Sequence, residues 1–356
     1  MRRKRLKAPA NLVGESAYYH CISRVVNRDF VLGDEEREQF VHYMRLYERL
    51  CGLRVVTYCI MSNHFHLLVA VPPRPQVLPD NAELVATVRT TLGEQEALRL
   101  EHDLLLCGQT NSPGWEEDVR ERYLRRMWDI SQFMKTLKQR FSQWFNKRHK
   151  RKGTLWEDRF RSVLVQAAGE PLAAMAAYIE LNPVRAAMVA DPKDYRWCGY
   201  GAAMGGDARA LAGLKEIERV RQAASPPQAK ETAPPLPAQA PIAVLATYRV
   251  LLYGRGVERG VGSDGQALRK GFSREEAAAV VANGGRLPRL DYLRCRVRYF
   301  TDGAVLGSRG FVNEVFEALR DQFSVHRQSG ARRLRGLAAE DEKLYSLRDL
   351  RQGLVT

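Results

Sequence analysis

Two histidines one residue apart, His64 and His66, are the residues whose types and spacing most directly suggest chemistry. They lie in the run MSNHFHLLVAV, whose composition predicts a β-strand over residues 64–71. Side chains alternate along a strand, so both imidazoles point to one face and can reach one metal ion, while Phe65 points into the core. Two surface or hydrogen-bonded histidines are the alternative. The apolar flanks favour the metal site, because two polar rings on a central strand need a partner.

A second candidate group lies in the segment YIELNPVRAAMV, which spans residues 178–189. Tyr178 and Asn182 are four residues apart, which places them on one face of a helix. A tyrosine hydroxyl can act as a nucleophile, and an asparagine oxygen can bind a hard metal ion. Pro183 favours a break at Asn182 that directs both groups inward. The alternative is a tyrosine that only packs in the core or at an interface, and these residues alone do not exclude it.

The positive charge is concentrated in two segments. Of a net charge of +15, residues 1–7 hold five Lys and Arg with no acid, and residues 120–161 hold fourteen with four Asp and Glu. The remaining chain is neutral overall, and such basic segments favour a polyanion as partner. Aromatic residues interleaved with the second segment suit stacking of single-strand bases. An amphipathic helix with core aromatics and a solvated basic face is the alternative.

The candidate DNA contacts in these two segments are Arg2, Arg3, Lys4, Arg5, Lys135, Lys138, Arg140, Lys147, Arg148, Lys150, Arg151, Lys152, Arg159 and Arg161. Arg24, Asn27 and Arg28, just after the first predicted strand, are further candidates. For these three, a solvated loop is the alternative.

The elements that must position these residues follow in the order strand, helix, strand, strand, helix, strand, helix. β-rich runs predict the strands, and apolar residues at helical spacing predict the helices. This order matches the ferredoxin-like split βαβ arrangement, an α+β fold with helices on one face of an antiparallel sheet. The predicted strands are residues 18–26, 53–59, 64–71 and 161–167, and the predicted helices are about 34–52, 120–150 and 170–181.

Three further segments set the expected domain organisation. Residues 74–118 are interpreted as a helical insertion and residues 206–241 as an Ala- and Pro-rich linker, because the composition of residues 223–241 cannot bury enough apolar surface to order that stretch. Residues 242–356 are then expected to form a small, mainly helical domain. Its Arg294, Arg296 and Arg298, ahead of a Gly-containing turn, suit a helix-turn-helix-like DNA reader, with a generic packing domain as the alternative.

Composition excludes several classes of protein. The 356 residues are 45% hydrophobic and 27% charged, as in soluble globular proteins. The apolar runs fall far short of the roughly 20 residues of a membrane span, and no apolar stretch typical of a secretory signal follows the basic start. A cytoplasmic protein is therefore expected. Six cysteines without a CxxC pair predict reduced, mostly buried thiols and no zinc site.

Four segments together resemble a known family. YYHCISRVVNRDFVL, TYCIMSNHFHLLVAV, FMKTLKQRFSQWFNKRHKRKGTLWEDRFRS and YIELNPVRAAMV follow one another within about residues 8–200. This order resembles the single-tyrosine HUH transposases, whose motif is a histidine pair flanking one hydrophobic residue. More closely, it resembles the REP-associated tyrosine transposases of the insertion-sequence-200-like superfamily, which are encoded beside repetitive extragenic palindromes.

The resemblance implies a ferredoxin-like catalytic domain over residues 1–205 and a bound Mg²⁺ or Mn²⁺. By position, His64 and His66 would bind the metal ion, Asn182 would be a third ligand and Tyr178 the nucleophile. The implied activity is DNA nicking and strand transfer on single-stranded or hairpin DNA through a 5′-phosphotyrosine intermediate.

Two other functions are alternatives. A catalytically silent nucleic-acid-binding regulator on the same scaffold would have no need of His64, His66 and Tyr178 together. A relaxase or replication-initiation HUH nuclease fits less well, because here the tyrosine follows the histidine pair in the sequence. A homodimer is compatible with the sequence, which does not fix the oligomeric state.

Overall fold

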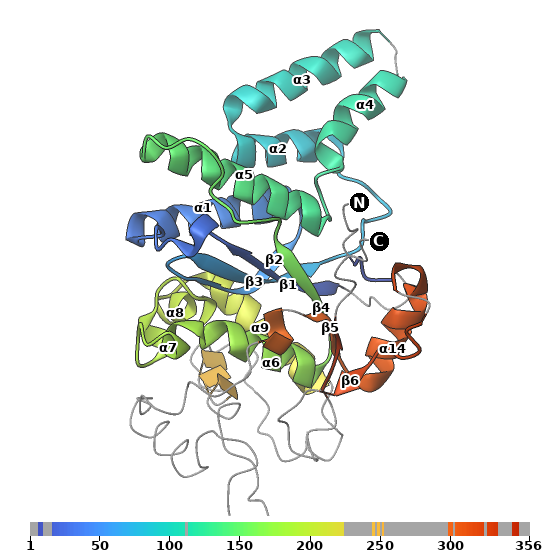
Figure 1. The fold of residues 1–356 in the computed structure, drawn as a ribbon. Helices are drawn as coiled ribbons and strands as arrows, with labels where there is room; N and C mark the ends of the chain where they lie inside the picture. The colour runs from blue at the N-terminus through green and yellow to red at the C-terminus, as the bar shows by residue number, and fades with distance from the viewer. Residues whose placement is uncertain are drawn as a thin grey trace, which may run out of the picture.

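One mixed sheet crosses the middle of the molecule (Figure 1). The computed structural model describes residues 6–9, 16–110, 113–223, 244–245, 248–249, 251–252, 298–301, 303–323, 326–333 and 344–348. Among these residues the strand order is β2-β3-β1-β4-β5-β7-β6. The strands are β1 (Ala17–Arg24), β2 (Arg54–Ile60), β3 (His64–Val71), β4 (Arg161–Val165), β5 (Gly303–Gly307), β6 (Arg332–Arg333) and β7 (Tyr345–Arg348).

Helices cover the sheet on both sides (Figure 1). Helices α1 and α5 lie on one side, and α6, α7, α8 and α9 lie on the other. The described helices are α1 (Asp34–Leu50), α2 (Asn81–Leu92), α3 (Glu94–Gln109), α4 (Pro113–Leu124), α5 (Ile130–Arg148), α6 (Gly169–Glu180), α7 (Asn182–Arg185), α8 (Gly199–Met204), α9 (Ala208–Ala223), α13 (Arg298–Thr301) and α14 (Arg309–Ala318).

The predicted α+β class and the ferredoxin-like order of elements are confirmed. Strand β1 pairs antiparallel with β3 on one side and β4 on the other, and β2 and β3 form the expected hairpin. Local signals explain these elements. For example, the Asp129 side chain accepts hydrogen bonds from the backbone N–H groups of Ser131 and Gln132 in the first turn of α5, at 2.6 and 3.0 Å.

The expectation that helices cover only one face of the sheet is wrong. Both alternating sets of β3 side chains are apolar and buried: Leu67 and Val69 belong to the core under α1 and α5, and Leu68 and Ala70 to the core over α6 and α9. A strand that is apolar on both faces needs a layer of helices on each.

The C-terminal part of the chain also departs from the expected separate helical domain. Strand β5 pairs parallel to β4, with Leu164 opposite Val305, and β7 continues the sheet beyond it. The sequence GAVLG therefore forms a strand instead of the expected Gly-containing turn. The reason is that the outer edge of β4 carries unpaired backbone N–H and C=O groups, and β5 pairs with them although it is far away in the sequence. The candidate DNA-reading residues Arg294 and Arg296 lie outside the described residues.

Two segment boundaries can be compared with the structure. The insertion is helical, as expected, because α2, α3 and α4 pack around a small core of their own. The expected linker over residues 206–241 begins too early, since α9 occupies Ala208–Ala223. Its buried Ala210, Leu214 and Ile217 pack on the lower face of the sheet. Residues 224–241 lie outside the described part of the chain.

Two predictions from composition can also be compared with the structure. Cys21, Cys51, Cys59, Cys107 and Cys198 are free and buried, as predicted, and Cys295 lies outside the described residues. Among the residues searched, those that the structure describes, no helix combines the length and apolar character of a membrane span.

Candidate active site

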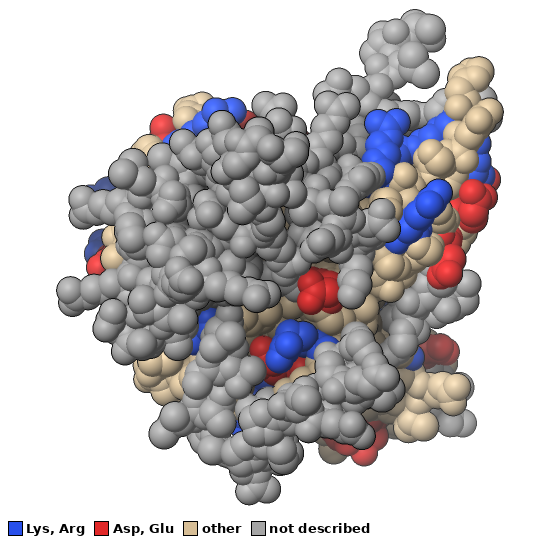
Figure 2. All heavy atoms as spheres, turned by 90° about the horizontal axis from the view of Figure 1, so that it is seen from below, with Lys and Arg blue, Asp and Glu red and all other residues tan. Residues whose placement is uncertain are grey.

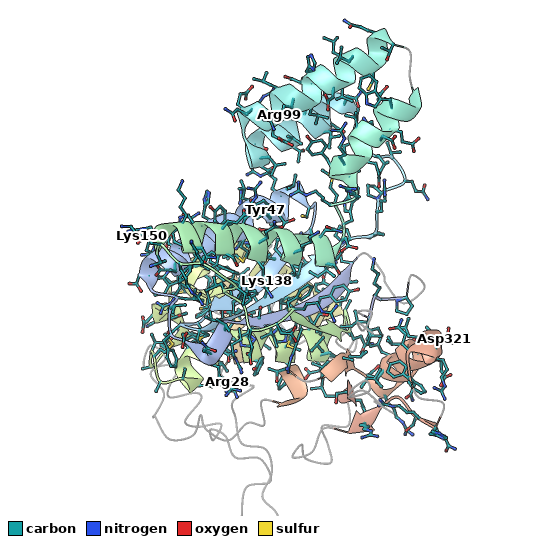
Figure 3. All side chains as sticks on the ribbon, turned by 45° about the horizontal axis from the view of Figure 1, so that its top comes forward. Arg28, Tyr47, Arg99, Lys138, Lys150 and Asp321 are labelled. Atoms are coloured by element: carbon teal, nitrogen blue, oxygen red, sulfur yellow. The ribbon has the colours of Figure 1, made fainter. Side chains whose placement is uncertain are left out.

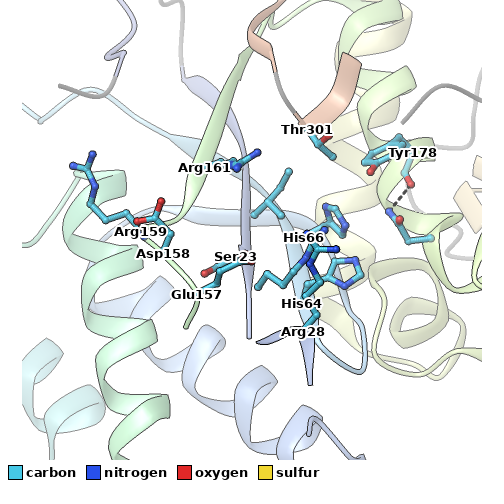
Figure 4. Close-up of a pocket in the computed structure, with 13 residues that line it drawn as sticks. Ser23, Arg28, His64, His66, Glu157, Asp158, Arg159, Arg161, Tyr178 and Thr301 are labelled. Atoms are coloured by element: carbon cyan, nitrogen blue, oxygen red, sulfur yellow. Dashed lines mark hydrogen bonds between the residues drawn. The ribbon is translucent and has the colours of Figure 1, made fainter. Parts of the chain in front are cut away.

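A polar cavity of about 680 Å³ opens where the central strands meet the N-terminal end of α7 (Figure 4). It brings together both histidines of the pair, Tyr178 and Asn182, as the sequence predicts. Four arginines surround them, and two acidic residues stand at the far side. The lining residues are Ile22, Ser23, Arg24, Arg28, His64, His66, Glu157, Asp158, Arg159, Arg161, Tyr178, Asn182 and Thr301.

The histidine pair lies on β3, with both rings on the face toward α6. The ring centres of His64 and His66 are 5.0 Å apart, with planes at 82°. Phe65 points to the opposite face, where its ring centre lies 4.6 Å from that of Phe40 and 5.4 Å from that of Trp156. The alternation predicted from the sequence is thus confirmed, with Phe65 serving as a core anchor for the strand.

Both imidazoles are neutral near neutral pH. Burial lowers the pKa of His64 to about 4, with a further lowering by the charge of Arg24. Burial lowers the pKa of His66 well below its usual value. Neutral imidazole is the form that binds a metal ion. Each Nδ1 atom has a hydrogen-bond partner: Asn63 Oδ1 at 2.7 Å for His64 and His20 Nε2 at 2.9 Å for His66.

Tyr178 comes from α6 and faces the histidine pair. Its ring meets that of His66 edge-on, with centres 5.6 Å apart and planes at 89°. On its other side the ring of Phe300 is stacked at 4.6 Å and 11°. The Arg185 guanidinium carbon lies 5.0 Å from the centre of the tyrosine ring. Burial raises the pKa of Tyr178 to about 12, and the charge and hydrogen bond of Arg185 act in the opposite direction.

Asn182 begins α7 one turn after Tyr178, where Pro183 interrupts the helix as predicted. Its Nδ2 donates to the carbonyl oxygens of Tyr178 at 2.8 Å and Ile179 at 3.3 Å (Figure 4). Because the amide nitrogen donates to these carbonyl groups, Oδ1 is the atom of this side chain that can bind a metal ion. The helix break therefore places an oxygen donor beside the tyrosine.

The donor set fits a small divalent cation held by few protein ligands. Among the described residues, no group of three or more His, Cys, Asp and Glu side chains is arranged to hold a metal ion. The Nε2 atoms of His64 and His66 have no hydrogen bond to a described residue, and Asn182 adds one oxygen. Mg²⁺ and Mn²⁺ take oxygen ligands readily, and water or phosphate can supply the remaining positions.

The basic candidates divide by position. Arg159 and Arg161 line the cavity, as do the further candidates Arg24, at the end of β1, and Arg28, in the loop after it. The others follow α5 and the loop after it on the opposite side of the sheet, where Lys138 and Lys150 are labelled in Figure 3. Arg148 donates two hydrogen bonds to the Glu35 carboxylate, at 2.8 and 3.1 Å. Residues 2–5 lie outside the described residues.

The aromatic residues of the basic segment belong to the core. Phe141, Phe145, Trp156 and Phe160 are buried, and Trp144 packs against the same cluster. The interpretation of the basic segment as an amphipathic helix with core aromatics is therefore correct for the four buried rings, which are not open to nucleic-acid bases. Phe30, which the sequence did not single out, is 82% exposed and is the large ring that the described surface offers for stacking near the cavity's Arg28.

Sequence reasoning missed three residues of the site: His20, Arg185 and Phe300. His20 stacks on His66, with ring centres 5.1 Å apart. A histidine inside the first predicted strand was the available signal, and the arginine of NPVR was another. Phe300 comes from a segment far away in sequence, so no local pattern connects it to the tyrosine.

Glu180, between Tyr178 and Asn182, is a structural residue and does not line the cavity. It is fully buried and accepts hydrogen bonds from the Thr57 hydroxyl and from the Tyr200 backbone N–H, the latter at 2.9 Å. It thereby ties α6 to β2 and α8. Burial raises the pKa of Glu180 to about 7, against the hydrogen bonds that favour its charged form.

The stability of the protein is expected to fall as the pH rises from about 4.5 through about 7, because Glu180 ionises later in the folded than in the unfolded chain. Glu180→Gln removes this pH-dependent loss of stability, because glutamine does not ionise. Relative to the wild type, the variant should gain about 1–3 kcal/mol in free energy of unfolding between pH 5 and pH 8. Urea unfolding at the two pH values measures this difference. Glu38→Gln, at an exposed carboxylate, is the control, and an equal effect of Glu180→Gln at both pH values would contradict the prediction.

Fold and cavity together define a ferredoxin-like domain with a strand-borne histidine pair opposite a helix-borne tyrosine. The family model described as "Transposase IS200 like" matches residues 14–80 and 124–182, which include all four predicted site residues. These two segments are therefore similar to an IS200-like transposase, in line with the resemblance seen in the sequence. The unmatched residues between them coincide with the insertion helices α2 to α4.

One solved structure similar to this chain carries the description "Structure of the REP associates tyrosine transposase bound to a REP hairpin". The similarity has 11% sequence identity and a TM-score of 0.34, and it covers 56% of this chain and 86% of that chain. No curated protein matches the sequence.

Proposed function

We propose that this protein is a metal-dependent tyrosine transposase that nicks single-stranded or hairpin DNA and transfers the cleaved strand. One observation carries the proposal: Tyr178 meets His66 edge-on at 5.6 Å in a cavity that four arginines line. A tyrosine hydroxyl, two neutral imidazoles and four guanidinium groups are thereby gathered in one place. A silent binding protein would need only the arginines.

The nucleophile is the Tyr178 hydroxyl. Its oxygen attacks the scissile phosphorus, the tyrosine–phosphorus bond forms, and the bond between phosphorus and the 3′-oxygen breaks. The phenolic proton passes to solvent, and the departing oxygen takes up a proton to give a free 3′-hydroxyl. The product is a 5′-phosphotyrosine, whose ester retains the reactivity needed to rejoin or transfer the strand without ATP.

His64 and His66, with Asn182 as an additional oxygen donor, would hold Mg²⁺ or Mn²⁺. A cation held by these residues would supply polarisation of the scissile phosphate and would offset the negative charge that develops on it. The chain's own residues prepare the nucleophile. Arg185 lies over the Tyr178 ring and favours the phenolate, which burial otherwise disfavours. Phe300 fixes the ring plane by stacking on its other face.

The substrate is expected to be a strand whose phosphates are exposed. Arg24, Arg28, Arg159 and Arg161 surround the cavity and can bind successive phosphates. On the face seen from below, by contrast, the visible described Lys and Arg side chains lie beside Asp and Glu (Figure 2). The four lining arginines thus favour approach of DNA to the cavity rim.

Removing the two cavity arginines at the start of β4 is expected to weaken DNA binding without changing its site. Arg159→Gln combined with Arg161→Gln should lower the affinity for a hairpin oligonucleotide about tenfold at physiological salt. The slope of log affinity against log salt should become shallower by about 1 for each of the two arginines that binds a phosphate in the wild type. Fluorescence anisotropy over a salt series measures both quantities.

The matched control is Arg99→Gln, at an exposed arginine of the insertion, far from the cavity (Figure 3). It should leave the affinity and the slope unchanged. Equal slopes for the double variant and the wild type would show that these arginines do not contact phosphate.

The activity itself is tested with oligonucleotides from palindromes near the gene, labelled in separate reactions at the 5′ or the 3′ end. With Mn²⁺ or Mg²⁺, the 3′-labelled fragment should migrate as a covalent protein adduct on a denaturing gel, and the 5′-labelled fragment should be released. EDTA should prevent both. Tight hairpin binding without any adduct would instead identify a catalytically silent DNA-binding regulator.

A further inference from the structure

We propose that His20 and Asn63 are positioning residues that hold His66 and His64 in a single tautomer, with each Nε2 directed to the cavity as a metal ligand. The inference rests on the metal site proposed above. It goes beyond that site because neither His20 nor Asn63 contacts the metal. Each acts through one imidazole and is itself fixed by a backbone carbonyl group.

The first relay, which here means a chain of hydrogen bonds that ends on a metal-binding histidine, begins at Phe300. Its carbonyl oxygen lies 3.0 Å from His20 Nδ1, and a carbonyl can only accept a hydrogen bond, so Nδ1 carries the proton. His20 is fully buried, and its hydrogen bonds to described residues go to this carbonyl and to another imidazole, so no carboxylate in the described part of the chain compensates a positive charge on it. In the neutral ring Nε2 then has no proton. It accepts from His66 Nδ1 at 2.9 Å, which leaves the lone pair of His66 on Nε2.

The second relay begins at Arg28. Its carbonyl oxygen accepts a hydrogen bond from Asn63 Nδ2 at 2.9 Å, which fixes the orientation of the amide. Asn63 Oδ1 therefore faces His64 Nδ1 at 2.7 Å, and as an acceptor it requires a proton there. The lone pair of His64 is again on Nε2. Two chemically different relays thus give both histidines the same tautomer.

This agreement matters because a histidine binds a metal ion only through a nitrogen without a proton, turned toward the ion. A hydrogen bond on the other ring nitrogen fixes both the proton and the ring orientation. Both relays begin at backbone carbonyls, whose polarity cannot reverse. The first also depends on α13, a segment outside the residues matched by the family model, so the C-terminal part of the chain helps to build the metal site.

The test compares His20→Leu with His20→Gln in the full-length protein. Leucine fills space but cannot accept the hydrogen bond from His66, whereas the glutamine side-chain oxygen can. Mn²⁺ affinity, measured from the electron paramagnetic resonance signal of free Mn²⁺, should fall about 10–100-fold in His20→Leu and largely recover in His20→Gln. An unchanged affinity in folded His20→Leu would overturn the proposal.

The tautomer is measured separately, without metal, by long-range ¹H–¹⁵N correlation of the histidine rings. In the wild type both His64 and His66 should carry the proton on Nδ1. His20→Leu should alter His66 alone, and Asn63→Leu, at a half-buried position that is less demanding for folding, should alter His64 alone. A proton on Nε2 of wild-type His66 would refute the relay. If wild-type protein binds no Mn²⁺ while the tautomers are as stated, the proposed metal site fails and the relay stands.

Discussion

Tyr178→Phe is expected to abolish covalent attachment to DNA and to lower the nicking rate by at least about 10³-fold, as removal of a nucleophile does in other enzymes. The substitution removes one oxygen atom and keeps the ring that Phe300 and Arg185 contact. Hairpin affinity should therefore be unchanged. Single-turnover cleavage of an end-labelled hairpin with Mn²⁺ measures the rate, and anisotropy measures the affinity.

A second buried tyrosine provides the matched control. Tyr248 packs in the same core as Tyr178, and its hydroxyl has no hydrogen-bond partner in the described structure. Tyr248→Phe should thus keep full activity. If Tyr178→Phe nicked DNA at the wild-type rate, another residue would be the nucleophile. If it lost hairpin binding together with cleavage, the tyrosine would act in binding rather than in chemistry.

Loss of either histidine of the pair is expected to have the next largest effect. His64→Ala and His66→Gln each remove a nitrogen with no other partner among the described residues, so Mn²⁺ binding and metal-dependent cleavage should drop by at least about 10²-fold. His66→Gln is preferred to alanine because it fills part of the space next to His20. Titration with Mn²⁺ and cleavage assays at saturating DNA measure the two effects.

The control for these variants is His42→Ala, which removes an exposed histidine from α1. It should bind Mn²⁺ and cleave as the wild type does. A wild-type response to Mn²⁺ in both His64→Ala and His66→Gln would exclude the pair as metal ligands, whatever the role of Tyr178.

The parts of the site that the sequence predicted are those set by periodicity within one element. Alternation along β3 placed His64 and His66 on one face and Phe65 on the other, and the four-residue spacing placed Tyr178 and Asn182 together. The same signal was ambiguous for α5. A basic helix with interleaved rings suits DNA stacking or core packing equally, and only the packing of Phe141 and its neighbours distinguishes the two.

The parts that escaped prediction depend on contacts between distant segments. His20 and Phe300 are 280 residues apart and meet because β5 completes the edge of β4. Glycine-rich GAVLG favours a turn by its local preferences, and it becomes a strand only beside its partner. Burial of both sheet faces likewise depends on which helices pack against each face. The sequence of a single helix or strand does not determine this packing.

The most direct test of the account is to identify the residue that becomes attached to DNA. After reaction with a hairpin oligonucleotide and Mn²⁺, the adduct is digested with trypsin and nuclease and analysed by tandem mass spectrometry. Cleavage after Arg161 and Arg185 releases residues 162–185, in which Tyr178 is the single tyrosine. The account predicts a nucleotide 5′-phosphate on Tyr178 in this peptide and none in the presence of EDTA. Attachment at any other residue, or DNA cleavage without an attached peptide, would contradict it.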